Sequence, residues 1–216
     1  MTDQWWHVCW LALGFSALFA AAETMHRGLG MPSEWSRKFM HISGGLLSLS
    51  MPLLFDNPWF VFGLAAAFGG LLWVSRRLGW LDSVHRVHRV DRISYGSLLF
   101  PVPVLLCFWL GWWQHDWLLF RLPILILTLA DPAAFFIGKL LSRGVAARGS
   151  SGKTLGGSAA FALVAGACCW YFLPEKPVLA AVICVFTTLA EAWSGRGWDN
   201  LTVPVAAAGL LLVTAS

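Results

Sequence analysis

Four ionisable residues stand at the ends of long apolar runs, where side chains of their kind are chemically useful. They are His41, Asp131, Glu191 and Asp199. A charged group within or at the rim of a membrane helix is costly to keep there, so such groups are functional candidates by default. Carboxylates prefer hard cations such as Mg²⁺, and a histidine or a carboxylate can orient or deprotonate a hydroxyl group.

Asp131 precedes a proline in the segment LTLADPAAFFIGK. Pro132 lacks an N–H and frees a backbone carbonyl one turn earlier, which predicts a polar break late in an apolar helix. An aspartate beside such a break is a candidate ligand of Mg²⁺ or of the substrate. The alternative is a structural kink whose aspartate is paired with Arg121 or Lys139.

Two further oxygen-bearing residues follow in the segment EAWSGRGWDNLTVP. Glu191 ends one apolar run, and Asp199 and Asn200 open the next. Asp199 could serve as a helix N-cap, but capping does not account for the carboxylate of Glu191. Asp131, Glu191, Asp199 and Asn200 are therefore the candidate ligands of Mg²⁺.

A basic pair marks the segment RKFMHISGG. Arg37 and Lys38 precede His41 by about one helical turn, so an anion bound by the arginine lies within reach of the histidine. The alternative is a basic pair that contacts anionic lipid headgroups, with His41 capping its own helix.

The segment RGSSGKTLGGS resembles a phosphate-binding P-loop at first sight. The Walker pattern requires a glycine five residues before Gly152, where the chain has Ala147, and a preceding strand, where it has an apolar helix. The pattern therefore fails. Small residues before a helix that starts near Leu155 still expose N–H groups to an anion, so Gly152, Lys153 and Thr154 are candidate phosphate ligands. A flexible basic loop is the alternative.

The elements that carry these residues are predicted to be membrane helices. The chain is 58% hydrophobic and 12% charged, with a mean hydropathy of +0.68, whereas a soluble domain has about 25% charged residues. About 20 apolar residues cross the hydrocarbon core. The sequence predicts one all-α membrane domain over 1–216 with eight spans, or seven because the last two are short: 5–22, 39–55, 58–75, 95–113, 117–138, 155–173, 178–194 and 201–215.

The basic residues predict the orientation of these spans. All of the 15 lysines and arginines except Arg121 and Lys176 fall in loops that alternation places on one side. The positive-inside rule makes that side cytoplasmic and puts the N-terminus outside. The four ionisable residues named first then gather at the cytoplasmic face, where a water-soluble co-substrate can meet a substrate held in lipid.

The motifs, taken in order, resemble one family. RKFMH with Gly44 and Gly45, RISYG with Phe100 and Pro101, ADPAA…GK, SGKTLGGS and E…GWDNLTVP are similar to motifs of the CTP-dependent lipid-alcohol kinases: phytol kinase, dolichol kinase, yeast-type diacylglycerol kinase and bacterial polyprenol relatives. The resemblance covers residues 37–204. Family members usually carry a glutamate in Lys-Thr-x-Glu-Gly-Ser, where this chain has Gly156.

The resemblance implies transfer of the γ-phosphate of CTP, with Mg²⁺, to the hydroxyl group of a membrane lipid alcohol. Arg37, Lys38, Lys139 and Lys153 would then bind the triphosphate, while His41 or Asp131 would act on the hydroxyl. The expected partners are the lipid alcohol, CTP and the bilayer, with no nucleic acid, and the expected location is a bacterial inner membrane. The oligomeric state and the identity of the lipid are not indicated by the sequence.

Two other functions remain open at this point. A phosphatidate cytidylyltransferase also uses CTP, Mg²⁺ and a membrane lipid, but releases pyrophosphate. A lipid or anion transporter would line its pathway with similar residues, although its charges should face both sides of the membrane.

Overall fold

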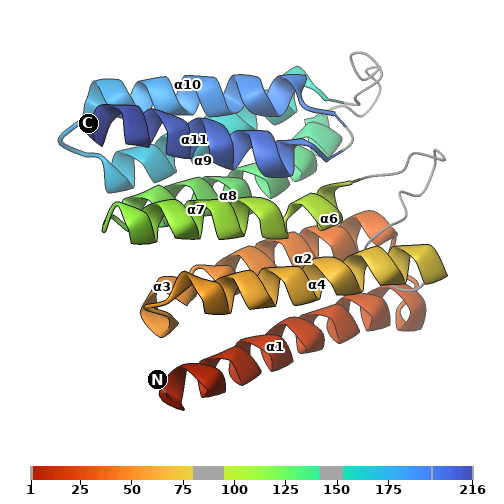
Figure 1. Ribbon diagram of the computed structural model, residues 1–216. Helices are drawn as coiled ribbons and strands as arrows, with labels where there is room; N and C mark the ends of the chain where they lie inside the picture. Colours follow the sequence, from red (N-terminus) through yellow and green to blue (C-terminus); the bar gives the residue numbers. More distant parts are fainter. Residues whose placement is uncertain (1, 80–94, 142–152, 196, 216) are drawn as a thin grey trace.

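Apolar helices that lie side by side and alternate in direction form the described part of the chain (Figure 1). The computed structural model describes residues 2–79, 95–141, 153–195 and 197–215. In chain order the helices are α1 Thr2–Glu23, a π-helical turn η1 Thr24–Gly28, α2 Ser33–Ser48, α3 Met51–Leu54, α4 Pro58–Leu78, α6 Gly96–Leu99, α7 Pro101–Trp113, α8 Leu118–Leu141, α9 Leu155–Phe172, α10 Pro177–Trp193 and α11 Asp199–Ala215. Within the described ranges there are helices and no strand, which confirms the all-α prediction.

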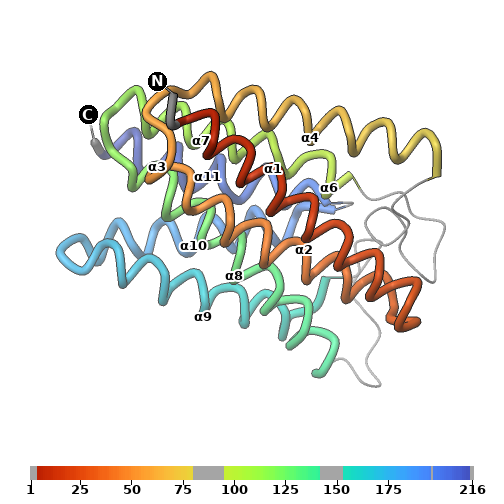
Figure 2. Tube along the Cα trace, turned by 90° about the horizontal axis from the view of Figure 1, so that it is seen from below, coloured from red at the N-terminus to blue at the C-terminus, as the bar shows by residue number. Residues whose placement is uncertain are grey.

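The chain passes back and forth along the bundle, and both termini lie at the same end (Figure 1). The opposite end receives the start of α2, the end of α8 and the starts of α9 and α11, as the second view also shows (Figure 2). Segments far apart in the sequence therefore meet at one end of the molecule. These are the segments in which the sequence placed the candidate site.

Five of the described helices are long and apolar enough to cross a membrane: Gln4–Gly28, Pro58–Leu78, Gly96–Trp113, Leu118–Leu141 and Leu155–Phe172. α10 and α11, predicted as the two short spans, are apolar but shorter. The predicted span 39–55 differs more from the helix found in the structure. That helix, α2, begins at Ser33 and ends at Ser48, and it includes the charged residues Glu34, Arg37 and Lys38. The structure thus supports a multi-pass membrane protein, and the number of eight spans stays a prediction.

Local sequence signals explain where α4 begins and ends. The side chain of Asn57 accepts a hydrogen bond from the backbone N–H of Trp59 at 3.0 Å, and Pro58 occupies the first turn, where its missing N–H leaves no bond unmade. At the other end Gly79 has a φ of 68°, the left-handed conformation that commonly ends a helix at glycine. The connection between α3 and α4 is therefore short, from residue 55 to residue 57.

α8 is the central helix, because its side chains enter two separate cores. Leu122 and Ile126 belong to a core shared with α9, α10 and α11. Phe120 and Ile124 belong to a second core, which α1, α3, α4 and α7 complete. Helices in lipid gain stability from close packing rather than from water exclusion. The stability of the bundle therefore depends on the residues that let neighbouring helices approach α8.

Glycines allow α2 and α9 to approach α8. A Cβ added to Gly45 of α2 would lie 2.0 Å from Thr128 Oγ1 of α8. Thr128 cannot easily turn away, because its hydroxyl donates to the carbonyl of Ile124 at 2.6 Å. On the other side of α8, a Cβ on Gly157 of α9 would lie 2.8 Å from the carbonyl oxygen of Ala134. Both contacts require a residue with no side chain.

Gly45→Ala is expected to lower the free energy of unfolding by about 1–3 kcal/mol, the usual cost of overpacking a close contact. The added methyl group would overlap Thr128 and force α2 away from α8. Thermal unfolding in detergent, followed by tryptophan fluorescence, measures the change.

Gly69→Ala on α4 is the matched control, since no heavy atom lies within 4 Å of the added Cβ. Adding Thr128→Ala to Gly45→Ala removes two of the three overlapping atoms and should recover part of the loss. The close-approach interpretation is wrong if Gly45→Ala unfolds at the same temperature as Gly69→Ala.

Candidate active site

The first part of the site lies where α2 crosses α8. Lys38 Nζ donates to Asp131 Oδ2 at 2.5 Å, and His41 Nε2 lies 3.6 Å from the same oxygen. Lys38, His41 and Gly45 follow one another at helical spacing on α2, so the glycine contact with Thr128 brings the two polar residues onto Asp131. The Asp131 side chain is 9% exposed, and Lys38 supplies the charge that a buried carboxylate needs.

His41 is held in a defined orientation by α8. Its Nε2 lies 2.8 Å from the carbonyl oxygen of Leu127, and since a carbonyl only accepts, Nε2 carries the proton. The ring also packs edge-on against Phe100, with centroids 5.5 Å apart. His41 therefore contacts α8 and does not cap its own helix.

Two expectations about Asp131 are corrected by this geometry. Its ion-pair partner is Lys38, a residue 93 positions away, and not Arg121 or Lys139. The predicted break in the helix at Pro132 is also absent. α8 continues through Pro132 to Leu141. Close packing on both sides of α8 keeps the helix continuous across the proline.

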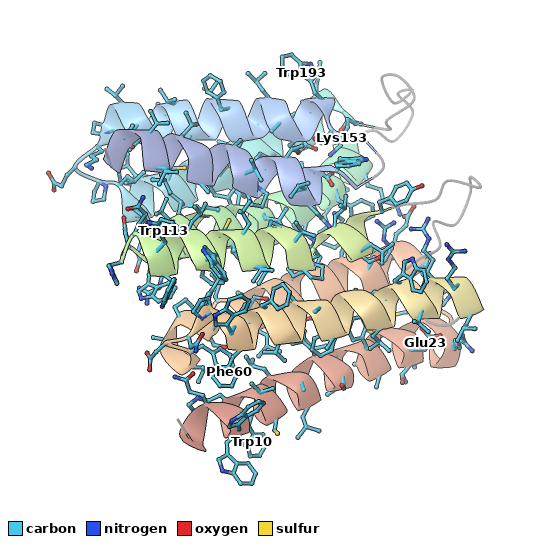
Figure 3. All side chains as sticks on the ribbon, in the orientation of Figure 1. Trp10, Glu23, Phe60, Trp113, Lys153 and Trp193 are labelled. Carbon is cyan, nitrogen blue, oxygen red and sulfur yellow. The ribbon has the colours of Figure 1, made fainter. Side chains whose placement is uncertain are left out.

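The second part of the site is a lysine between two carboxylates. Lys153 Nζ donates to Glu191 Oε1 at 2.5 Å and to Asp199 Oδ2 at 2.9 Å. The Ser158 hydroxyl donates to the other oxygen of Glu191 at 3.1 Å. We refer to these four residues as the Lys153 cluster; Figure 3 shows Lys153 at the end of the bundle opposite Trp113.

The charge on Lys153 is strongly favoured. Burial alone would lower the pKa of Lys153, but Asp199 and Glu191 outweigh burial and raise that pKa above its usual value. The ammonium group therefore stays protonated at neutral pH and neutralises one of two carboxylates that are almost fully buried. Sequence reasoning assigned Lys153 to phosphate and the carboxylates to a metal, whereas the structure pairs them with each other.

The start of α9 positions the Lys153 cluster. Thr154 Oγ1 accepts a hydrogen bond from the Gly157 N–H at 3.0 Å, so Thr154 is the N-cap of α9 and Lys153 directly precedes it. A Cβ on Gly138 of α8 would lie 2.8 Å from Thr154 Oγ1, so the cap rests on that glycine. That Thr154 caps a helix was not predicted from the sequence. A threonine directly before the first residue of a helix is the usual signal of an N-cap.

Gly156 occupies the position at which the lipid-alcohol kinases usually have a glutamate. A Cβ built there would lie 2.8 Å from Cδ1 of Leu141 at the end of α8. The Leu141 side chain is exposed and flexible enough to move. The Cα–Cβ bond of any other residue at position 156 would therefore point toward the end of α8.

Asn200 joins α11 to α6. Its side-chain Nδ2 donates to the carbonyl oxygen of Gly96 at 2.8 Å, and its backbone N–H donates to Asp199 Oδ1 at 3.0 Å. Asn200 thus orients the neighbouring carboxylate and holds Gly96 beside it. Gly96 belongs to the RISYG segment, of which Tyr95 and Gly96 are among the described residues.

A cavity lies beside the site, and Asp199 is the member of the Lys153 cluster that lines it. Its polar end is lined by Arg37, Lys38, His41, Asp131, Asp199 and Asn200. Arg37 lies between the parts, where the negative charges of Asp131 and Asp199 both act on its guanidinium group. The remaining lining is mostly apolar and comes from α1, α2, α3, α4 and α7. The cavity therefore brings a charged site and a hydrocarbon-like surface into one space.

Some predicted site residues are not brought together here. Lys139 donates to Glu34 at 2.7 Å on the surface, with 54% of its side chain exposed, and does not line the cavity. Gly152 lies outside the described residues. Among the described residues, no group of three or more His, Cys, Asp or Glu side chains is arranged to hold a metal ion. Ser158 is the polar member that sequence reasoning missed, although it belongs to the SGKTLGGS motif.

Comparison with known proteins places the chain in a family. The model of the cytidylyltransferase family matches residues 2–197. The chain belongs to this family. A phytol kinase of Synechocystis sp. is 27% identical over 213 residues, which cover 92% of this chain and 89% of that protein. No solved structure matches the chain. The resemblance to the lipid-alcohol kinases is thus confirmed, and a lipid kinase or cytidylyltransferase type of function is supported.

Lys153→Met is expected to destabilise the protein by about 3–5 kcal/mol, because removing one partner of a buried ion pair leaves uncompensated charge. Here it would leave both Glu191 and Asp199 without their cation. Thermal unfolding measures the loss, and adding Glu191→Gln should recover part of it.

Lys139→Met is the matched control. The Lys139–Glu34 pair is exposed, and exposed pairs contribute about 0–1 kcal/mol. Equal unfolding temperatures for the two lysine variants would contradict the structural role given to Lys153.

Proposed function

We propose that the protein is a CTP-dependent kinase that transfers the γ-phosphate of CTP to the hydroxyl group of a membrane lipid alcohol. The observation that carries the proposal is the cavity, whose charged end continues into an apolar interior. A soluble phosphate donor and a hydrocarbon acceptor need these two environments side by side. The similarity to a phytol kinase supports the same class of acceptor.

Charge neutralisation and alignment are the main requirements of phosphoryl transfer. Arg37 and Lys38 at the charged end of the cavity, together with Lys153, bind the triphosphate in this proposal. An ammonium group has three N–H donors, and Lys153 uses two of them for Glu191 and Asp199. The third is available for a phosphate oxygen without breaking either pair.

Asp131 is the proposed base. The hydroxyl oxygen of the acceptor bonds to the γ-phosphorus as the bond from phosphorus to the bridging oxygen breaks, CDP leaves with that electron pair, and the hydroxyl proton passes to the Asp131 carboxylate. Lys38 keeps this carboxylate ionised. His41, whose Nε2 proton is bound by the Leu127 carbonyl, positions the acceptor beside Asp131.

The Lys153 cluster fits a divalent cation in its donor chemistry. Two carboxylate oxygens already converge on one positive charge, and Mg²⁺ commonly binds through one or two carboxylates together with substrate phosphates. Glu191 and Asp199 are the proposed ligands, and Asn200 orients Asp199. When bound there, Mg²⁺ would neutralise charge on the transferred phosphoryl group.

The site faces the cytoplasm of a bacterial inner membrane in this proposal. The basic loops predict that orientation, and the site residues lie at the end of the bundle away from both termini (Figure 1). CTP is available on that side. A transporter is disfavoured, because the buried charged residues of the described segments gather at this one end.

The family description favours a second candidate, a cytidylyltransferase, which would transfer CMP to a lipid phosphate. Purified protein in vesicles that contain a prenol or diacylglycerol, and in separate vesicles that contain phosphatidate, distinguishes the two, using CTP labelled at the α- or γ-phosphate and ATP as an alternative donor. The kinase predicts γ-label in the lipid. If α-label enters a lipid phosphate and γ-label appears in pyrophosphate, the protein is a cytidylyltransferase.

Asp131→Asn is expected to lower the rate of lipid phosphorylation about 10²–10⁴-fold, the usual contribution of a general base. The volume of the side chain is retained, but Lys38 loses the charge of its partner, so kcat is measured per folded protein at a temperature below the unfolding transition of the variant. The rate of γ-label transfer from CTP measures it.

Asp116→Asn is the matched control at the other end of the bundle. Asp116 accepts from the Leu118 N–H at the start of α8, and asparagine caps a helix about as well as aspartate. A similar rate in the two variants would remove Asp131 from the mechanism.

A further inference from the structure

The residues that line the cavity on α2 and α4 give its length along the bundle. On α2 its lining runs from Arg37 to Ser48, and on α4 from Val61 to Leu72. Each stretch advances eleven residues, or about 16 Å at 1.5 Å per residue. The two helices give the same length, which is about half of the roughly 30 Å hydrocarbon thickness of a bilayer. The cavity therefore extends from the charged end over a distance of about half the hydrocarbon thickness.

The far end of the cavity is closed and apolar. Met51, Val61 and Val104 line it there and are 3%, 0% and 3% exposed. Ser48 is the polar residue at this depth, and its hydroxyl donates to the Gly44 carbonyl at 2.8 Å. We call Met51, Val61 and Val104 the cavity floor. These buried apolar side chains bound the cavity at its far end.

We propose that the hydrocarbon chain of the acceptor alcohol lies in this cavity with its end against the cavity floor, so that the floor sets the preferred chain length. The inference rests on the proposed function, because the hydroxyl group of the acceptor is placed at His41 and Asp131. From His41 to Ser48 the cavity advances about 10 Å. With carbon–carbon bonds of about 1.5 Å, an extended chain advances about 1.3 Å per carbon, so about eight carbons fill this distance.

The sides of the cavity carry aromatic and small residues that suit such a chain. Phe15 and Phe68 lie with ring centroids 5.0 Å apart and line the cavity from α1 and α4. Ala65 lies one turn beyond Val61 on α4, part of the way up from the floor. A larger side chain at Ala65 shortens the available space, and a smaller one at Val61 lengthens it.

The experiment measures kcat/KM for CTP-dependent phosphorylation of linear primary alcohols from about six to about sixteen carbons. In the wild type, kcat/KM is expected to rise about fourfold for each added carbon that finds contact with the lining, and to stop rising near eight to ten carbons. Val61→Ala should move this limit to longer chains. Ala65→Phe should move it to shorter ones.

Val213→Ala is the matched control, because it makes the same change at a side chain of α11 that is 76% exposed. This variant should leave the limit unchanged. A limit that stays in place in both Val61→Ala and Ala65→Phe, or that moves in Val213→Ala, overturns the inference.

A binding measurement separates this inference from the proposed function. A ten-carbon alcohol with a photoreactive diazirine at its last carbon is irradiated with the wild type, and the labelled peptides are identified. Labelling at the cavity floor supports the inference even if no alcohol accepts phosphate, which would by itself refute only the kinase proposal. Labelling that instead falls on the lipid-facing Leu163 of α9, which is 76% exposed, refutes the inference.

Discussion

Charges buried at one end of the bundle must be paired, and the rest of the structure is arranged to meet that requirement. Asp131, Glu191 and Asp199 are almost fully buried, and a buried carboxylate without a partner would be strongly destabilising. Lys38 and Lys153 supply the partners from helices that are distant in sequence. Such pairs contribute little net stability compared with apolar residues of the same size, so we attribute their presence to function.

α8 makes this pairing possible because small residues allow its neighbours to approach on both sides. Gly45 lets α2 pack against Thr128 and so places Lys38 at Asp131. Gly138 accommodates the Thr154 cap, which fixes the position of Lys153. The two parts of the site are therefore both positioned by close contacts with α8, each made at a glycine.

The sequence was sufficient to predict the helices and the end of the bundle at which the site lies, because hydropathy and basic loops are local signals. It also named Asp131, Glu191, Asp199 and His41 as candidates, and the structure places them in the two polar clusters at that end. The ion-pair partners of these residues could not be predicted from the sequence. The pairing of Lys38 with Asp131 spans 93 positions and depends on how closely α2 packs on α8. Lys139, which is nearer in sequence to Asp131, lies on the surface with Glu34.

The charge balance of the site also bears on what it binds. Arg37, Lys38 and Lys153 carry three positive charges, and Asp131, Glu191 and Asp199 carry three negative ones. The described site is therefore neutral before any substrate enters. A nucleoside triphosphate alone would add a large negative charge to a space of low dielectric constant, where repulsion from the carboxylates is strong. A divalent cation that entered with the nucleotide, as proposed above, would reduce that charge. Lysine suits such a site better than arginine, because its three N–H donors can hold both carboxylates and still reach a phosphate oxygen without depending on a bidentate contact.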